Sequence, residues 1–125
     1  MTLNERIIAV VTPIVPVCVP DLLVTEAGET PPEEYCTFKF PLEPEALADD
    51  TSQLQRALVL LHYFAPLKTN TVPTRRALWA ALAAAEDFSP AMIENATDHT
   101  GQHYVFEFDA VGRWLGDERS GGDPF

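Results

Sequence analysis

Two strand-like segments constrain the fold of this chain more than any other feature. Residues 55–65 (QRALVLLHYFA) are apolar at nearly every position, which is typical of a central strand that is covered on both faces. Residues 102–111 (QHYVFEFDAV) alternate between apolar and polar side chains, which predicts a strand with one buried and one wet face. We therefore expect a sheet built around these two segments.

The first element is expected to be a short helix. Thr2 and Glu5 have the spacing of a capping box, and Pro13 and Pro16 would end the helix because proline lacks the backbone N–H. The β-branched run in residues 7–11 also fits a strand, so both interpretations stay open here. The helical interpretation gives one apolar stripe, made of Leu3, Ile7, Val10, Val11 and Ile14.

The sequence predicts the element order helix, strand, strand, helix, strand, strand. The remaining elements are expected at residues 34–40 (strand), 74–87 (helix) and 91–95 (strand). Thr71 or Thr74 would cap the second helix. The periodicity predicts a core that contains Cys36, Phe38, Phe40, Val59, Leu61, Leu78, Leu82, Tyr104, Phe106 and Phe108. We expect residues 1–111 to form a single α/β domain and the glycine-rich residues 112–125 to form a flexible tail.

The charge balance excludes several classes of partner. The chain has 19 acidic and 8 basic residues, a formal net charge of −11. A nucleic-acid reader needs a basic stripe that displaces counterions, and an anionic membrane attracts basic segments. Neither partner is therefore expected, although an acidic wall suits a conduit through which DNA passes without sticking.

The excess negative charge is concentrated in two loops. Lys39 is the only basic residue between positions 21 and 50, a span that is otherwise rich in acidic residues. Two arginines at the start of the second helix oppose the helix macrodipole, and such a misfit indicates either simple surface charge or a pairing with an acidic loop of a neighbouring chain. The candidate residues of a subunit interface or lumen are Glu43, Glu45, Asp49, Asp50, Arg75 and Arg76.

No residue pattern in the chain is typical of a catalytic or metal centre. His62, His99 and His103 lack metal-ligand spacing, and neither a nucleophile elbow nor a phosphate-binding loop is present. We therefore expect no enzyme activity, no cofactor and no bound catalytic metal. His62 and His103 would meet across paired strands, which keeps a small site there as an alternative to packing.

The two cysteines and the N-terminal residues bear on the cellular compartment. Cys18 and Cys36 do not form a C-x-x-C pair and are expected to be reduced core residues. The first residues lack the charge order of a secretory signal, so an intracellular protein is expected.

Four local strings resemble the tail terminator (minor tail, or tail-completion) proteins of long-tailed bacteriophages and prophages. They are residues 4–20 (NERIIAVVTPIVPVCVP), 35–40 (YCTFKF), 62–70 (HYFAPLKTN) and 95–106 (NATDHTGQHYVF). The resemblance covers most of the chain up to about Val111. No catalytic motif accompanies it, and it assigns no functional residue to this chain.

The resemblance implies both a fold and a role. The fold would be α/β (α+β), with a mixed, mainly antiparallel sheet of about four strands flanked by two helices. The role would be structural: a ring of identical subunits, typically a hexamer, that caps the tail tube and joins it to the head connector. Such a protein resides in the host cytoplasm before assembly and then in the virion, and DNA only passes through it. The alternatives are another head–tail connector or neck protein, or a small-molecule-binding domain or enzyme that uses His62 and His103.

Overall fold

The computed structural model describes residues 2–41 and 55–112. Its helices and strands are α1 (Leu3–Val11), β1 (Cys18–Pro20), β2 (Tyr35–Lys39), β3 (Gln55–Ala65), α2 (Val72–Ala84), β4 (Met92–Asn95) and β5 (Gln102–Gly112). The residues of the second acidic loop, including Glu43, Glu45, Asp49 and Asp50, lie outside the described residues. The same is true of residues 113–125 of the expected tail, whose first residue, Gly112, instead ends β5.

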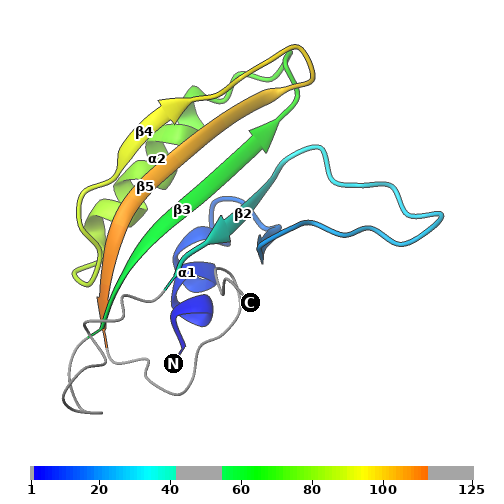
Figure 1. The fold of residues 1–125 in the computed structure, drawn as a ribbon. Coiled ribbons are helices and arrows are strands. Elements are labelled where there is room, and N and C mark those ends of the chain that lie inside the picture. Colours follow the sequence, from blue (N-terminus) through cyan, green and yellow to red (C-terminus); the bar gives the residue numbers. More distant parts are fainter. Residues whose placement is uncertain (1, 42–54, 113–125) are drawn as a thin grey trace.

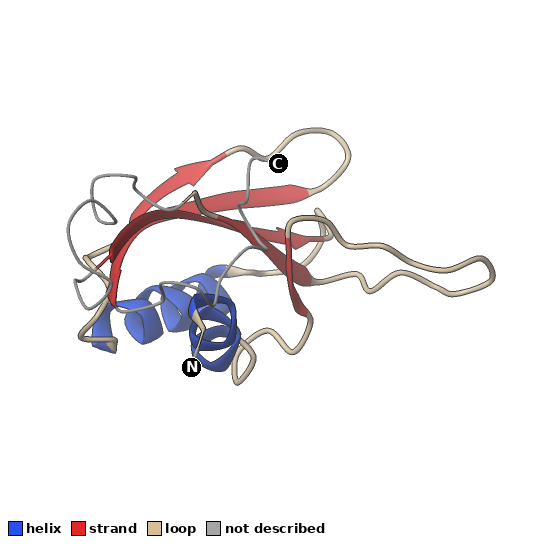
Figure 2. Cartoon of the chain, turned by 60° about the horizontal axis from the view of Figure 1, so that its bottom comes forward, coloured by secondary structure: helices blue, strands red, loops and turns tan. Residues whose placement is uncertain are grey.

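The strands form one mixed sheet in the order β1-β2-β3-β5-β4. β1 pairs with β2 in parallel, and the other neighbours are antiparallel. Both helices pack against the same face of the sheet, as Figures 1 and 2 show. The expected α+β class is therefore confirmed. We call the sheet face that carries the helices the helix face, and the opposite one the open face.

The expected strand count and element order were slightly wrong, because the sequence analysis missed β1. This strand has only three residues and follows a proline-broken apolar run, so it shows no alternation. Pro20, which cannot donate a backbone hydrogen bond, is tolerated there because β1 lies at the sheet edge. The observed order is helix, three strands, helix, two strands.

The first helix is confirmed, and the alternative strand interpretation of residues 7–11 is wrong. The backbone N–H of Glu5 donates to Thr2 Oγ1 at 3.1 Å, and the backbone N–H of Thr2 donates to Glu5 Oε1 at 2.8 Å, which completes the capping box. Two residues of the expected apolar stripe, Val10 and Ile14, are only partly buried. Val15, which was not part of the expected stripe and lies after the end of the helix, is fully buried. The fully buried residues of the helix are Leu3, Ile7 and Val11.

The second helix starts and stops earlier than expected. Pro73 is accommodated in its first turn, where a missing N–H costs little. The helix ends at Ala84 because the following residues join the sheet, where Phe88 bridges to Ala110 of β5. Thr71 is the N-cap residue but makes no side-chain capping hydrogen bond.

The core lies between the helices and the helix face of the sheet. Alternate residues of β2, β3 and β5 point into it, and all of the residues expected in the core are buried. Among the described residues, the largest fully buried side chains of the strands are Tyr63, Phe38, Phe106 and Phe108, and Phe40 is buried directly after β2. The alternation in residues 102–111 was therefore interpreted correctly.

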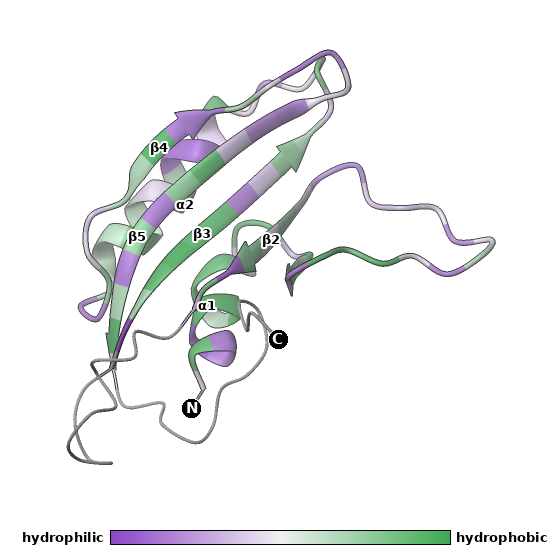
Figure 3. Cartoon of the chain, viewed as in Figure 1, coloured by the Kyte–Doolittle hydropathy of each residue, from purple (hydrophilic) through white to green (hydrophobic). Residues whose placement is uncertain are grey.

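The expectation that the central strand is covered on both faces was wrong. β3 is central and mostly apolar (Figure 3), but its alternate residues face the open side, where Leu58 is 37% exposed. Its other apolar open-face residues, Leu60 and Phe64, are half-buried by neighbouring side chains. Among the described residues, no second layer covers this face of the sheet.

Candidate functional site

A row of rings crosses three strands on the open face. Tyr35 of β2 stacks on Phe64 of β3, with ring centroids 4.8 Å apart, and Phe64 stacks on His103 of β5 at 4.4 Å. His62 lies diagonally opposite His103 across the antiparallel β3–β5 pair, and its Nδ1 is 2.8 Å from His103 Nε2. The expectation that the two histidines meet across paired strands is therefore confirmed.

Burial keeps the histidine pair neutral at ordinary pH. Burial lowers the pKa of His62, and the neighbouring His103 and Lys39 lower it further. Burial also lowers the pKa of His103, while the carboxylate of Asp98 acts in the opposite direction. A neutral pair forms the hydrogen bond with one ring N–H and one lone pair.

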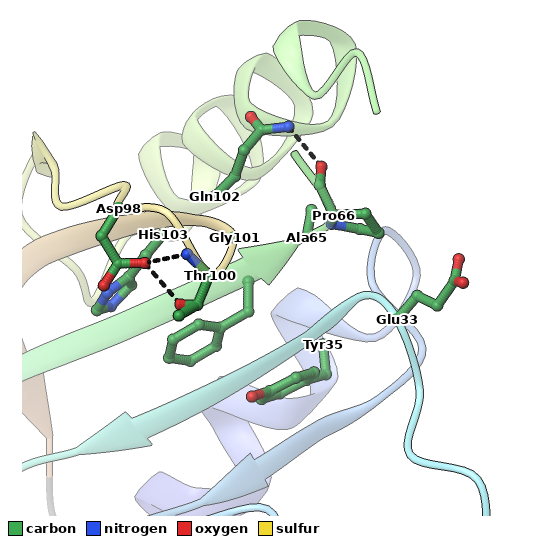
Figure 4. Close-up of a pocket in the computed structure, with 10 residues that line it drawn as sticks. Glu33, Tyr35, Ala65, Pro66, Asp98, Thr100, Gly101, Gln102 and His103 are labelled. Carbon is green, nitrogen blue, oxygen red and sulfur yellow. Dashed lines mark hydrogen bonds between the residues drawn. The ribbon is translucent and has the colours of Figure 1, made fainter. Parts of the chain in front are cut away.

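Two hollows flank the ring row. The larger one, about 400 Å³, lies between the end of β3 and the β4–β5 turn (Figure 4). There Asp98 Oδ1 accepts hydrogen bonds from the backbone N–H of Thr100 at 2.9 Å and from its hydroxyl at 2.6 Å. The smaller one, about 280 Å³, lies between the ring row and residues 21–23.

The ring row offers little chemistry beyond packing and hydrogen bonding. Among residues 2–41 and 55–112, no group of three or more His, Cys, Asp or Glu side chains is placed to hold a metal ion. Both cysteines are free and buried, and burial raises the pKa of the Cys18 thiol to about 12 and also raises that of Cys36. These thiols are therefore protonated and poor nucleophiles. Neither described helix has the length and apolar character that crossing a bilayer requires.

A second surface lies between α2 and β4, and we call it the α2–β4 groove. It is lined by Val72, Arg75, Arg76, Trp79 and Ile93 and encloses about 520 Å³. Its apolar members are 38% (Val72), 44% (Trp79) and 47% (Ile93) exposed. The structure thus places the two candidate arginines together, beside an apolar floor.

The apolar floor of the groove was missed by the sequence analysis, although a signal was present. Positions 72, 75, 76 and 79 have the spacing i, i+3, i+4, i+7, so they share one face of α2. That face is distinct from the buried stripe of Leu78 and Leu82. A second amphipathic face on one helix was therefore readable from the chain. The contribution of Ile93 was not readable from the chain, because only the sheet order brings β4 alongside α2.

A third surface is the loop that follows β1, residues 21–34, which we call the acidic loop. It extends away from the sheet on the side opposite α2 and β4 (Figures 1 and 2). Asp21 pairs with Lys39 at 3.5 Å, but the remaining acidic residues carry no described basic partner. The candidate acidic residues of the other loop, Glu43, Glu45, Asp49 and Asp50, lie outside the described residues, so the structure does not relate them to Arg75 and Arg76.

A scan of protein-family models and a search of curated proteins gave no match to this chain.

Proposed function

We propose that this chain is a structural tail protein of a bacteriophage or prophage, a tail terminator that forms a ring. The ring caps the tail tube, stops its polymerisation and joins it to the head connector. One observation carries the proposal: two unlike surfaces, the acidic loop and the α2–β4 groove, lie at opposite edges of one sheet. The local strings that resemble tail terminators support the same role.

A closed ring needs a heterologous interface, in which one face of a subunit meets a different face of the next. A single-domain subunit satisfies this need when its two contact surfaces differ and point in opposite directions. Here one surface is negative and the other carries Arg75 and Arg76, so the two are electrostatically complementary. A hexamer is the stoichiometry that the resemblance implies.

The overall charge supports a role at a DNA conduit. A net charge of −11 repels phosphate, so a genome slides past such a ring without specific binding. Glu43, Glu45, Asp49 and Asp50 remain the candidate lumen residues. The proposed partners are other copies of the chain, the tail tube protein and the head connector, and the proposed location is the virion. The role needs neither catalysis nor a cofactor.

Two alternatives remain. A neck or connector protein uses the same ring chemistry at another position in the particle. A small-molecule-binding domain is favoured by one observation, the hydrogen-bonded pair of His62 and His103 beside two hollows on an uncovered sheet face.

The decisive experiment is to image the purified full chain by negative-stain microscopy and to follow it by sedimentation, alone and with tail tube protein. We expect closed rings and tubes that carry a ring at one end and stop growing. Rings that bind a connector but leave tube growth unchanged would support the neck protein instead. A strict monomer at high concentration, even with tube present, would contradict both assembly roles.

A further inference from the structure

We infer that the acidic loop of one copy docks in the α2–β4 groove of the next copy. This inference rests on the proposed function, because it names the two surfaces that form the junction of the ring. It requires three properties of the chain: a groove with an unsatisfied cation, a loop with matching apolar and acidic groups, and an arrangement that prevents the two from pairing within one subunit.

The groove presents a fixed apolar floor. The indole N–H of Trp79 donates to the carbonyl oxygen of Ala91 at 3.3 Å, which fixes the ring beside β4. Ile93 faces the same side, since its partner on β5 is the buried Phe106. Such a floor of exposed apolar side chains in a hollow is typical of a contact surface.

One of the two groove arginines is already engaged, and the other is available. Arg75 Nε donates to Thr71 Oγ1 at 3.0 Å, and its guanidinium lies 4.3 Å from the centroid of the Tyr104 ring. Arg76 is exposed and makes no hydrogen bond or ion pair with any residue in 2–41 or 55–112. An acidic ligand would therefore pair with Arg76 at the rim of the groove.

The acidic loop carries the groups that fit this groove. Leu22 and Val24 are 70% and 75% exposed, so both aliphatic side chains are available for a contact. Residues 21–34 contain no lysine or arginine and include Glu26, Glu29 and Glu33. A turn at the loop tip is held by Glu29 N–H, which donates to the carbonyl oxygen of Glu26 at 3.0 Å. The loop thus offers an aliphatic pair next to a cluster of carboxylates.

The sheet order makes the occupant a second copy. The acidic loop leaves from the β1–β2 edge, whereas the groove lies at the β4 edge, with β3 and β5 between them. The loop also extends away from its own groove (Figure 1). Docking between copies is therefore head to tail, and it closes into a ring or continues as a filament according to the angle between subunits.

A mixing experiment with two defective full-length chains tests the inference. The loop variant is Leu22→Ser with Val24→Ser, at exposed loop positions that leave the core intact. The groove variant is Val72→Glu with Arg76→Glu, at exposed positions of α2 that leave its buried residues Leu78 and Leu82 unchanged. The matched controls are Leu67→Ser and Arg56→Glu, which change an exposed apolar residue and an exposed cation elsewhere.

Sedimentation of each variant alone should show assembly weakened by about tenfold or more. The loop variant loses the burial of two aliphatic side chains, and the groove variant loses the burial of Val72 together with the cation that pairs with the acidic loop. An equimolar mixture should form a one-to-one dimer and no ring, since the intact loop of one chain meets the intact groove of the other. The controls should assemble like the unaltered chain.

Three results would overturn the inference. If the unaltered chain forms rings and both variants still form them, the junction lies elsewhere and the proposed function stands. If each variant is monomeric but their mixture stays monomeric, the two surfaces are not partners. If the unaltered chain never assembles, even with tube protein, the inference and the proposed function both fail.

A cross-linking measurement checks the same contact directly. Cysteines placed by Val24→Cys and Ile93→Cys in one chain should form intermolecular disulfides and a ladder on a non-reducing gel. The native thiols are buried and should not contribute. The control pair, Val24→Cys with Val111→Cys, should give no ladder; a ladder of equal strength in the control would contradict the docking.

Discussion

At the scale of single residues, the core of the sheet concentrates stability in a few aromatic side chains. Phe106 is fully buried on β5, between the central strand β3 and the edge strand β4. Its ring fills space that the sheet cannot close by relaxing, because β5 is held by a ladder to β3 on one side and to β4 on the other.

We expect Phe106→Ala to lower the free energy of unfolding by about 3–5 kcal/mol, through lost transfer free energy and a residual cavity. Denaturant unfolding measures this value. Met92→Ala is the matched control: Met92 is 72% exposed on β4, and surface truncations stay within about 0.5 kcal/mol. Unaltered stability in the Phe106→Ala chain would contradict the placement of Phe106 in the core.

The histidine pair predicts a pH dependence of stability. Both folded pKa values lie below the ordinary value of 6.5, so the unfolded chain binds more protons as the pH falls. The contribution of the pair is therefore fully present above about pH 6.5 and is lost as the pH falls through the lowered folded values. Double protonation also removes the lone pair that accepts the hydrogen bond.

We expect His103→Asn to flatten the plot of unfolding free energy against pH between about 7 and 5. His99→Asn, in the exposed β4–β5 turn, serves as the control and should keep the slope of the unaltered chain. Equal slopes in all three chains would show that the pair does not titrate differently on folding.

At the scale of elements, a buried polar network joins α2 to the sheet. Gln102 at the start of β5 accepts hydrogen bonds from the hydroxyls of Thr71 and Tyr104, at 2.7 and 2.9 Å. Its amide donates to the carbonyl oxygens of Pro66 and Thr69, at 2.8 and 2.7 Å. One side chain thus fixes the turn between β3 and α2.

We expect Gln102→Met to destabilise the fold by at least about 2 kcal/mol, because several polar groups lose their partners inside the protein. Tyr104→Phe removes only one hydroxyl from the network and should cost about 0.5–1.5 kcal/mol. Thermal or denaturant unfolding of both variants measures which of the two loses more stability. A smaller cost for Gln102→Met than for Tyr104→Phe would mean that water replaces the network.

The elements also show what the sequence could predict. The capping box and the alternation on β5 depend on local spacing, and both were predicted correctly. β1 and the uncovered face of β3 depend on how the elements are arranged in space, which local pattern does not encode: an apolar run looks the same whether its second face is covered by another layer or left open. The two arginines were identified as candidates from their place at the start of a helix. Ile93, which completes their groove, was not identified, because it reaches the groove only through the position of β4 in the sheet.

At the scale of the whole molecule, the salt dependence of assembly distinguishes two arrangements of charge. If acidic loops face each other across a lumen, salt relieves their repulsion and favours the ring. If the acidic loop pairs with Arg76 of a neighbour, salt weakens that pair. At about 1 M salt the Debye length is about 3 Å, so exposed charges are largely screened.

Docking of the acidic loop in the α2–β4 groove predicts that rising salt weakens assembly. Sedimentation across a salt series measures this dependence, with the Arg76→Gln chain as the control that should show a smaller change, because a neutral side chain removes the ion pair without adding repulsion. Assembly that strengthens steadily with salt would indicate opposed acidic loops instead.

The position of the loop and the groove at opposite edges of one sheet has a genetic consequence. A copy that has lost one of these surfaces still binds through the other, so it joins a growing arc and blocks the next addition. Such a copy terminates the growth of the ring instead of staying out of it. When a loop variant is co-expressed with the unaltered chain, we expect dominant loss of rings, steeper than its share of the pool. A loss only proportional to that share would indicate that defective copies are left out of assembly.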